Sequence, residues 1–222
     1  MSRRAPVLRL AAVALAAVAT AALTQSTAGA SFAGTTGNAG DKVSSAATFC
    51  STAPTTVLSA GDSWTDEANT SANHYDDLNL YVRSSSAGDR RHTWIRFDLP
   101  AVPARCDLVQ AKLSFYATAS AAGRNIDVYR ANPAATPWAS TTIWWSDEPT
   151  VATPPATNAV TTGAPGWQQW TVTALVQAQY PAGANNGFLL RDRVENAGTA
   201  QQQVYYDRQD ITYYPRLVLT WG

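Results

Sequence analysis

The sequence predicts an all-β protein, a jelly-roll-type sandwich of two antiparallel sheets with at most one short helix. Residues 92–118 carry the clearest signal, because apolar side chains occur there at every second position on both sides of a proline-containing bend. Such alternation is typical of strands with one buried face, since successive side chains leave opposite sides of a sheet. Each apolar face needs a second layer to cover it. Short strands with turn residues between them recur along the chain, which is typical of sandwiches and jelly rolls.

The first four expected strands lie before residue 120 and include the longest alternating runs. In the second of them, Leu78, Leu80 and Val82 share one side. The third and fourth repeat this pattern on either side of Pro100 and Pro103. In chain order, these strands cover residues 56–59, 78–83, 93–99 and 107–118.

Five further strands are short and are separated by turn segments such as 122–124 and 185–187. A short helix is expected over residues 174–180, because Thr173 favours a helix N-terminus and Pro181 ends the pattern. The five strands cover residues 125–130, 167–172, 188–191, 203–206 and 216–221.

Residues 1–30 are typical of a secretion signal. Arg3, Arg4 and Arg9 supply a positive start, residues 10–23 are uncharged and apolar, and the small residues that follow suit cleavage. A helix needs about 20 apolar residues to cross a membrane, so this run is short for an anchor. The arginine pair leaves twin-arginine export as an alternative route. We expect a secreted, extracellular protein with no membrane attachment after cleavage.

The mature chain divides into a leader and one domain. Residues 31–54 are rich in Ser, Gly, Ala and Thr without apolar periodicity, which predicts a flexible leader. Strand signals then continue through residues 55–222, a length that can bury one sizeable core. We expect this single β-sandwich domain to be a monomer.

The charge balance argues against a nucleic-acid partner. The full chain has 16 Lys and Arg and 16 Asp and Glu. Loss of the three arginines of the signal leaves 13 positive against 16 negative residues, a net charge of −3 with neutral histidines. A mildly acidic chain lacks the basic surface that binds nucleic acids.

Two cysteines, Cys50 and Cys106, remain after cleavage, and an even count in an exported protein suggests a disulfide. The bond would join the N-terminal segment to the strand that starts near Cys106. Closing a loop of roughly 56 residues would add about 4 kcal/mol of stability in the chain-entropy model. Two unpaired, small apolar residues are the alternative.

An ordered series of short motifs extends over residues 55–221, and no single motif is specific by itself. Its members are AGD at 60–62, NHY at 73–75, LNLYV at 78–82, WIRFDLP at 94–100, AKLSF at 111–115, VYR at 128–130, Trp138, TIW at 142–144, Pro149, WTVT at 170–173, NNGF at 185–188 and YPRLVLTW at 214–221. This ordered series resembles the DNRLRE domain, also described as carbohydrate-binding module family 96.

The resemblance implies a secreted, non-catalytic jelly-roll module, and some relatives are attached to polysaccharide-degrading enzymes or surface proteins. The chain departs from the family pattern at two positions. Thr171 stands where the family usually has Asp, and Asp76 stands where it often has Gly.

Outward positions of the expected strands carry aromatic and basic side chains, which suggests a polysaccharide-binding face. Aromatic rings cover the apolar C–H face of a sugar, and polar groups orient its hydroxyls. Arg and Lys suit uronate carboxylates, because charge-assisted pairs are strong. The alternative is that these rings pack beneath a loop such as 131–165. The expected ligand-binding residues are Tyr81, Arg83, Trp94, Arg96, Lys112, Tyr116 and Tyr129.

Five tryptophans between 138 and 170 form a second aromatic group in the sequence. The family pattern suggests that Trp138 and Trp144 are structural. Trp145 and Trp167 remain candidates for sugar platforms.

The sequence requires no cofactor, but an oxygen-rich segment suggests a structural calcium. Calcium binds six to eight oxygen ligands, which loop carboxylates and amides can provide. The candidate ligands are Asp62, Asn73 and Asp76, although no EF-hand spacing is present. A solvated acidic loop is the alternative.

Enzyme motifs are weak in this chain. The two histidines, His74 and His92, have no accompanying GxSxG turn. Asp76-Asp77 and Asp147-Glu148 are neighbours along the chain, but glycoside hydrolysis needs two opposed carboxyl groups. We therefore expect a non-catalytic binding module rather than a polysaccharide-active enzyme. An extracellular structural or adhesion module without sugar affinity is the alternative.

Overall fold

The structure is a computed structural model, and the residues that it describes are Cys50, 52–134, 136–157, 160–181 and 183–222. The predicted signal at 1–30 and most of the predicted leader at 31–54 lie outside these residues. In the part of the chain that the structure describes, no helix has the length and apolar character needed to cross a membrane.

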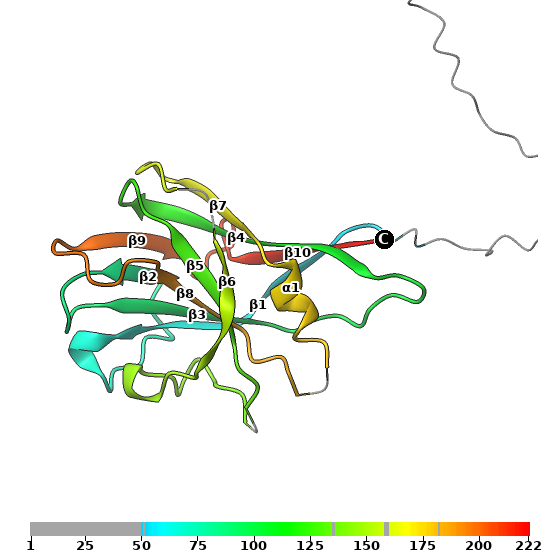
Figure 1. Ribbon diagram of the computed structural model, residues 1–222, viewed down its shortest axis with the longest axis horizontal. Coiled ribbons are helices and arrows are strands. Elements are labelled where there is room, and N and C mark those ends of the chain that lie inside the picture. Colours follow the sequence, from blue (N-terminus) through cyan, green and yellow to red (C-terminus); the bar gives the residue numbers. More distant parts are fainter. Residues whose placement is uncertain (1–49, 51, 135, 158–159, 182) are drawn as a thin grey trace, which may run out of the picture. The chain divides into compact units, whose positions relative to one another are not determined.

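The described residues form ten strands, one short α-helix and two 3-10 turns (Figure 1). All strand pairings are antiparallel, which confirms the all-β class. The one α-helix among the described residues is short, as predicted. The strands are β1 (Thr55–Asp66), β2 (Asn79–Ser84), β3 (Arg91–Phe97), β4 (Leu108–Ser120), β5 (Ile126–Ala131), β6 (Val151–Thr157), β7 (Gly166–Thr171), β8 (Phe188–Asp192), β9 (Gln201–Tyr206) and β10 (Arg216–Trp221). The helix α1 is Thr173–Gln177, and the 3-10 turns are Glu67–Asn69 and Trp145–Asp147.

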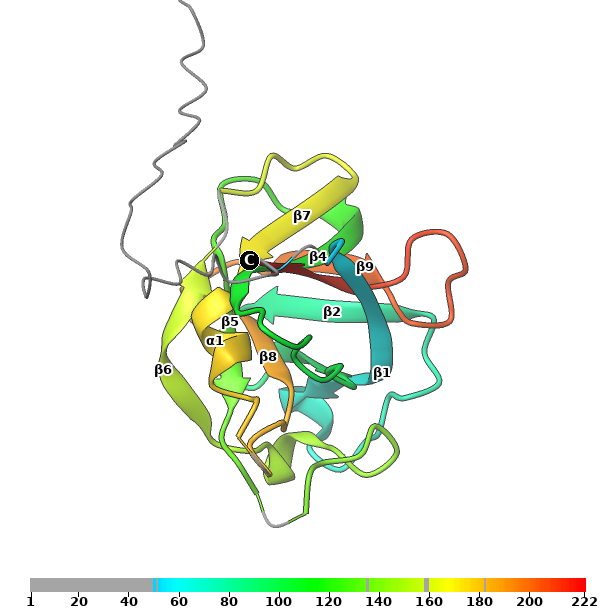
Figure 2. The same cartoon turned by 90° about the vertical axis from the view of Figure 1, so that its right-hand side faces the viewer.

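Strand β1 changes partner along its length and thereby closes the sheet on itself. Its first four residues pair with β10, and its pairing with β3 follows after a register shift between Ser59 and Gly61. Figure 2 shows β1 curving from one side of the fold to the other. The order β1-β10-β4-β9-β2-β3 thus returns to β1, and β8, β5, β6 and β7 extend this ring. The sequence predicted two separate sheets, but alternation identifies only the buried side of a strand and not its partner at each end.

The edge strand β6 was missed by the sequence analysis because Pro154 and Pro155 lie within it. Proline cannot donate a backbone hydrogen bond, and it is therefore confined mainly to edge strands. Among the described strands, β6 pairs with β5 alone, which satisfies this requirement.

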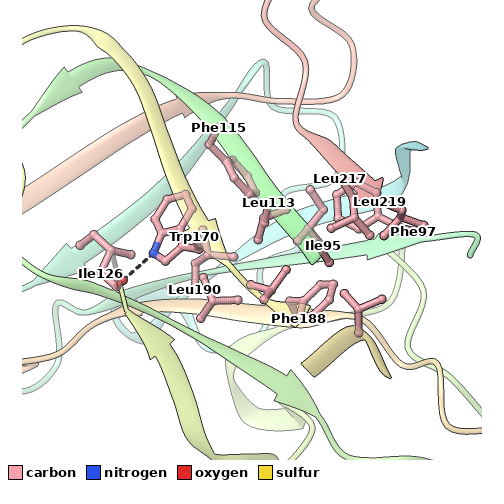
Figure 3. Close-up of a cluster of buried hydrophobic side chains, with 14 of the residues drawn as sticks. Ile95, Phe97, Leu113, Phe115, Ile126, Trp170, Phe188, Leu190, Leu217 and Leu219 are labelled. Atoms are coloured by element: carbon pink, nitrogen blue, oxygen red, sulfur yellow. Dashed lines mark hydrogen bonds between the residues drawn. The ribbon is translucent and has the colours of Figure 1, made fainter. Parts of the chain in front are cut away.

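The main hydrophobic core lies inside the ring and follows most of the predicted alternation; Leu78, predicted on the side of Leu80 and Val82, precedes β2 and is 65% exposed. Ile95, Leu113 and Phe115 are completely buried, and burial of each such side chain stabilises the fold by about 1.5–3 kcal/mol. Figure 3 shows Trp170 among them, and its indole Nε1 donates to the carbonyl oxygen of Ile126 at 2.7 Å. The polar edge of this buried indole is thereby satisfied.

One inward prediction on β4 is wrong. Strict alternation over the expected strand 107–118 places Val109 on the same side as Leu113, but Val109 is 54% exposed. A register shift in the β4–β10 pairing pairs Leu108 with Trp221, and Leu108 is buried instead. An extra residue in one strand reverses the side on which the following residues lie.

The predicted disulfide joins Cys50 to Cys106, with a Cα–Cα distance of 4.9 Å. It attaches the chain before β1 to the segment that leads into β4. Cys106 is 8% exposed, so the bond lies at the edge of the main core.

Candidate functional site

The outward side of β3, β5 and β8 is covered by a second apolar cluster. Trp94 is completely buried and Tyr129 is 8% exposed, so the prediction that both present rings to solvent is wrong. The segment after β5 supplies Trp138 and Ile143, which pack over them. The rings of Trp94 and Trp138 meet edge to face at 6.1 Å. The alternation predicted the side of the strand correctly, but this side of the sheet carries its own covering layer.

Arg96 holds this covering segment in place. Its Nη1 donates to the carbonyl oxygen of Trp138 at 2.9 Å, and its guanidinium lies 5.8 Å from the Trp138 ring. The side chain is half-buried between strand and loop. Arg96 therefore has a structural contact at the position where a sugar ligand was predicted.

Two predicted ligand residues on β2 also have protein partners. Tyr81 is half-buried, and its ring meets Trp64 edge to face at 4.8 Å. The guanidinium of Arg91 lies over both rings, at 5.4 Å from Tyr81 and 4.8 Å from Trp64. Arg83 forms a salt bridge with Asp89 at 2.6 Å. These contacts occupy the outer side of β2 near its hairpin with β3.

Tyr116 belongs to a different group of rings on the outer side of β4, β7 and β9. We call the half-exposed side chains Tyr116, Trp167, Tyr206 and Tyr213, together with Arg216, the aromatic surface. The Tyr116 ring lies 4.1 Å from Tyr213 and 5.5 Å from Trp167. Tyr206 and Tyr213 stack at 5.5 Å, and the Arg216 guanidinium lies 4.1 Å from the centre of the Trp167 ring.

Sheet register brings together the members of the aromatic surface that lie on β4, β7 and β10. Tyr116 on β4 is paired directly with Trp167 on β7, and Arg216 on β10 is paired with Ser114 on β4. Opposite residues on one face of a sheet lie about 5 Å apart, which brings their side chains into contact. Lys112 is exposed on the same side of β4, about 13 Å from Tyr116 at about 3.3 Å per residue.

The loop between β9 and β10 projects from the sheet (Figure 2) and returns Tyr213 to the aromatic surface. Asp210 orders its turn, because its Oδ1 accepts backbone N–H groups from Thr212 at 2.8 Å and Tyr213 at 2.6 Å. Asp side chains commonly stabilise turns in this way. Tyr213 therefore has a defined position although it lies outside the regular strands.

The sequence analysis identified Tyr116, Lys112 and Trp167 but missed the other three members of this face. Alternation could have found Tyr206 and Arg216, because Tyr205 and Leu217 beside them are core residues. Tyr213 lies in a loop, where no periodic signal exists. Next to Trp167, residues Val160–Thr162 and Ala164–Gln169 line a shallow hollow.

Trp145, the other tryptophan considered as a platform, packs against His92 at the start of β3, away from the aromatic surface. Its ring is 4.5 Å from the His92 ring, and the Arg90 guanidinium lies 5.4 Å from it. His92 is buried between two carboxylates: Nδ1 lies 3.0 Å from both oxygens of Glu148, and Nε2 lies 2.5 Å from Glu195. Burial lowers the pKa of His92, but the two carboxylates outweigh this effect and raise it above 6.5.

A pair of buried carboxyl groups lies where β1 meets the β9–β10 loop. Burial raises the pKa of Asp62 from 3.8 to about 7, and the neighbouring Asp207 carboxylate adds to the shift. Burial also raises the pKa of Asp207. Each residue is only 1% exposed, so neither reaches a polymer at the surface. The backbone N–H of Arg208 donates to Asp62 Oδ2 at 2.9 Å.

One acid of each sequence-adjacent pair forms hydrogen bonds to buried or half-buried aromatic and histidine side chains. Asp77 accepts the indole N–H of Trp64 at 2.9 Å and lies 3.0 Å from His74 Nδ1. Glu148 holds His92 and accepts the indole N–H of Trp94 at 3.2 Å. Asp77 and Glu148 are therefore parts of the fold, whereas Asp76 and Asp147, the other acid of each pair, are exposed.

Two of the three predicted calcium ligands have partners within the protein. Asp62 belongs to the buried pair described above. The Asn73 amide donates to the carbonyl oxygens of Ser140 at 2.7 Å and Ile143 at 2.8 Å, while Asp76 is exposed. Within the described ranges, no group of three or more His, Cys, Asp or Glu side chains is arranged to hold a metal.

Most of the described chain matches one known protein family. The family model for carbohydrate-binding module family 96 matches residues 53–220, which include all of β1 to β9 and all of β10 except its last residue, Trp221. No curated protein was found that matches this chain. The chain therefore belongs to carbohydrate-binding module family 96.

Proposed function

We propose that this protein is a secreted, non-catalytic module that binds uronic-acid polysaccharides through the aromatic surface. Family membership supports a carbohydrate ligand. The observation that carries the choice of site is the half-exposed cluster of four rings with Arg216 at its edge. Rings of this kind cover the C–H face of pyranose units.

The charge of this face supports an anionic ligand. Lys112 and Arg216 are its basic residues. The outward positions of β4, β7, β9 and β10 around them hold no Asp or Glu. Arg216 can donate to both oxygens of a carboxylate, and such charge-assisted bonds are stronger than neutral ones. A uronate chain across β4 would therefore meet rings and two cations without facing a carboxylate on these strands.

Affinity electrophoresis in gels that contain alginate, polygalacturonate, xylan or hydroxyethylcellulose tests this function. We expect retardation by the two uronate polymers. Arg216→Gln should weaken uronate binding about tenfold, which corresponds to the loss of one charged hydrogen bond of about 1.5 kcal/mol. Trp167→Ala should weaken binding of every retained polymer, because a ring face is lost. Uronate polymers whose chain length is unchanged after long incubation would support the non-catalytic role.

Two matched controls keep the test specific. Trp145→Ala removes another half-exposed tryptophan, and Arg130→Gln removes an arginine of β5, away from the aromatic surface. Both controls should retain wild-type retardation. A folded wild-type protein that no polymer retards would reject the proposal and favour a structural or adhesion module without sugar affinity.

A structural calcium at Asp62, Asn73 and Asp76 stays a prediction with its own test. Calorimetric titration should then show heat on calcium addition, and a chelator should lower the melting temperature. A melting curve that neither calcium nor chelator changes would reject this ion.

A further inference from the structure

A second hollow lies on other elements of the fold, between the end of β3 and the segment that follows α1. The segment before β4 contributes Leu99 and Pro100 to its lining. The segment after α1 contributes Gln179, Tyr180 and Asn185. No charged side chain is among the described residues that line this hollow.

Three of the residues that line the hollow carry a buried polar atom without a hydrogen-bond partner. Seven buried side-chain nitrogen or oxygen atoms of the described residues lack a hydrogen bond. Three of them, Gln179 Nε2, the Tyr180 hydroxyl and Asn185 Oδ1, belong to residues that line this one hollow. Buried polar atoms are nearly always paired, so three unpaired atoms on one lining point to an external partner.

The two amide side chains are already oriented by the protein. Gln179 is 3% exposed, and its Oε1 accepts the backbone N–H of Gly187 at 3.3 Å. The Asn185 amide nitrogen donates to the carbonyl oxygen of Phe97 at 2.9 Å. Each amide is therefore anchored at one end and leaves its other atom unpaired. A ligand that reached these atoms would find them already oriented, so the protein would lose little side-chain entropy on binding.

We propose that this hollow binds one ring of a neutral sugar, at a site separate from the aromatic surface. The unpaired atoms comprise one donor, one acceptor and one hydroxyl that can act as either. Sugar hydroxyls both donate and accept, so they match this set without a formal charge. Leu99 and Pro100 provide apolar contacts for the C–H groups of the ring. The absence of charge from the described lining distinguishes this site from the cationic face beside Arg216.

Nuclear magnetic resonance of 15N-labelled protein, titrated with xylotriose or cellotriose, tests this site. We expect at least one neutral trisaccharide to shift the side-chain amide signals of Gln179 and Asn185. Tyr180→Phe removes only the unpaired hydroxyl, so it should preserve the melting temperature and weaken this binding about fivefold. Trp167→Ala should leave these shifts unchanged.

The outcomes separate this site from the function proposed above. Loss of uronate retardation with retained trisaccharide shifts would reject only the aromatic surface. Amide signals that neither trisaccharide moves would mean that ordered water alone satisfies these atoms, and would overturn the sugar site. Shifts that disappear in Trp167→Ala, or that persist at full strength in Tyr180→Phe, would overturn it as well.

Discussion

Replacement of His92 by glutamine would remove the cation between Glu148 and Glu195. The histidine is 5% exposed and is hydrogen-bonded at both ring nitrogens. Glutamine can still donate one hydrogen bond, but it carries no charge. The two carboxylates would then stay in a half-buried site without the positive charge between them.

The expected loss of stability near pH 6 is about 3–5 kcal/mol, the usual effect of removing one partner of a buried ion pair. The contacts support a value in this range, because charged hydrogen bonds contribute about 1.5–3 kcal/mol each and His92 makes bonds to two carboxylates. Arg191 lies 3.3 Å from Glu195 and would still neutralise part of the remaining charge.

The pH dependence has a definite sign. The folded-state pKa of His92 lies above 6.5, so its stabilisation is fully present below pH 6.5 and declines as pH rises through the folded value. Burial raises the pKa of Glu195, but the His92 hydrogen bond and nearby cations lower it overall. The contribution of Glu195 is therefore lost on acidification below its ordinary value of 4.5. The stability difference between wild type and His92→Gln should be largest between these limits.

Urea unfolding followed by tryptophan fluorescence, at about pH 6 and about pH 9, measures this difference. His74→Gln, which replaces the other histidine and its single exposed carboxylate contact, is the control and should lower stability much less at about pH 6. A His92→Gln deficit that is equal at both pH values, or larger at the higher one, would refute a protonated His92 between two carboxylates.

Three further predictions concern burial, charge and the disulfide. Trp94→Ala should lower the free energy of unfolding by about 3–5 kcal/mol in urea titrations, as expected for a buried aromatic ring. Trp167→Ala should change it by less than about 1 kcal/mol, because this ring is half-exposed. Equal losses in the two variants would contradict the assigned burial. Because burial raises the pKa of Asp62 to about 7, the contribution of Asp62 to stability is lost as pH rises from 3.8 to about 7. Asp62→Asn should remove this contribution from the pH dependence of the calorimetric melting temperature, and a pH dependence identical to that of wild type would exclude an ionising Asp62. Paired Cys50→Ser and Cys106→Ser replacements should lower stability by about 4 kcal/mol in chemical denaturation, and a loss near zero would mean that the unfolded chain is not constrained by this bond.

Trp94 and Tyr116 show how far alternation reaches in this protein. Both residues were correctly placed on the side of their strands away from the main core. Trp94 is nevertheless buried, because Trp138 and Ile143 pack over that part of the sheet. Tyr116 stays half-exposed, because its neighbours are other surface rings. Period-two patterns report the direction of a side chain, whereas its exposure depends on which segment packs over the sheet.

The amino-acid sequence by itself determined the all-β class, most strand positions, the main core and the cysteine pair. These features follow from local alternation, turn residues and the even cysteine count. Only the tertiary structure decided that β1 joins β10 to β3 and that Tyr206, Tyr213 and Arg216 meet Tyr116. Strand partners and register are contacts between residues far apart in the chain, so no local pattern records them. The composition of the aromatic surface depends on those contacts.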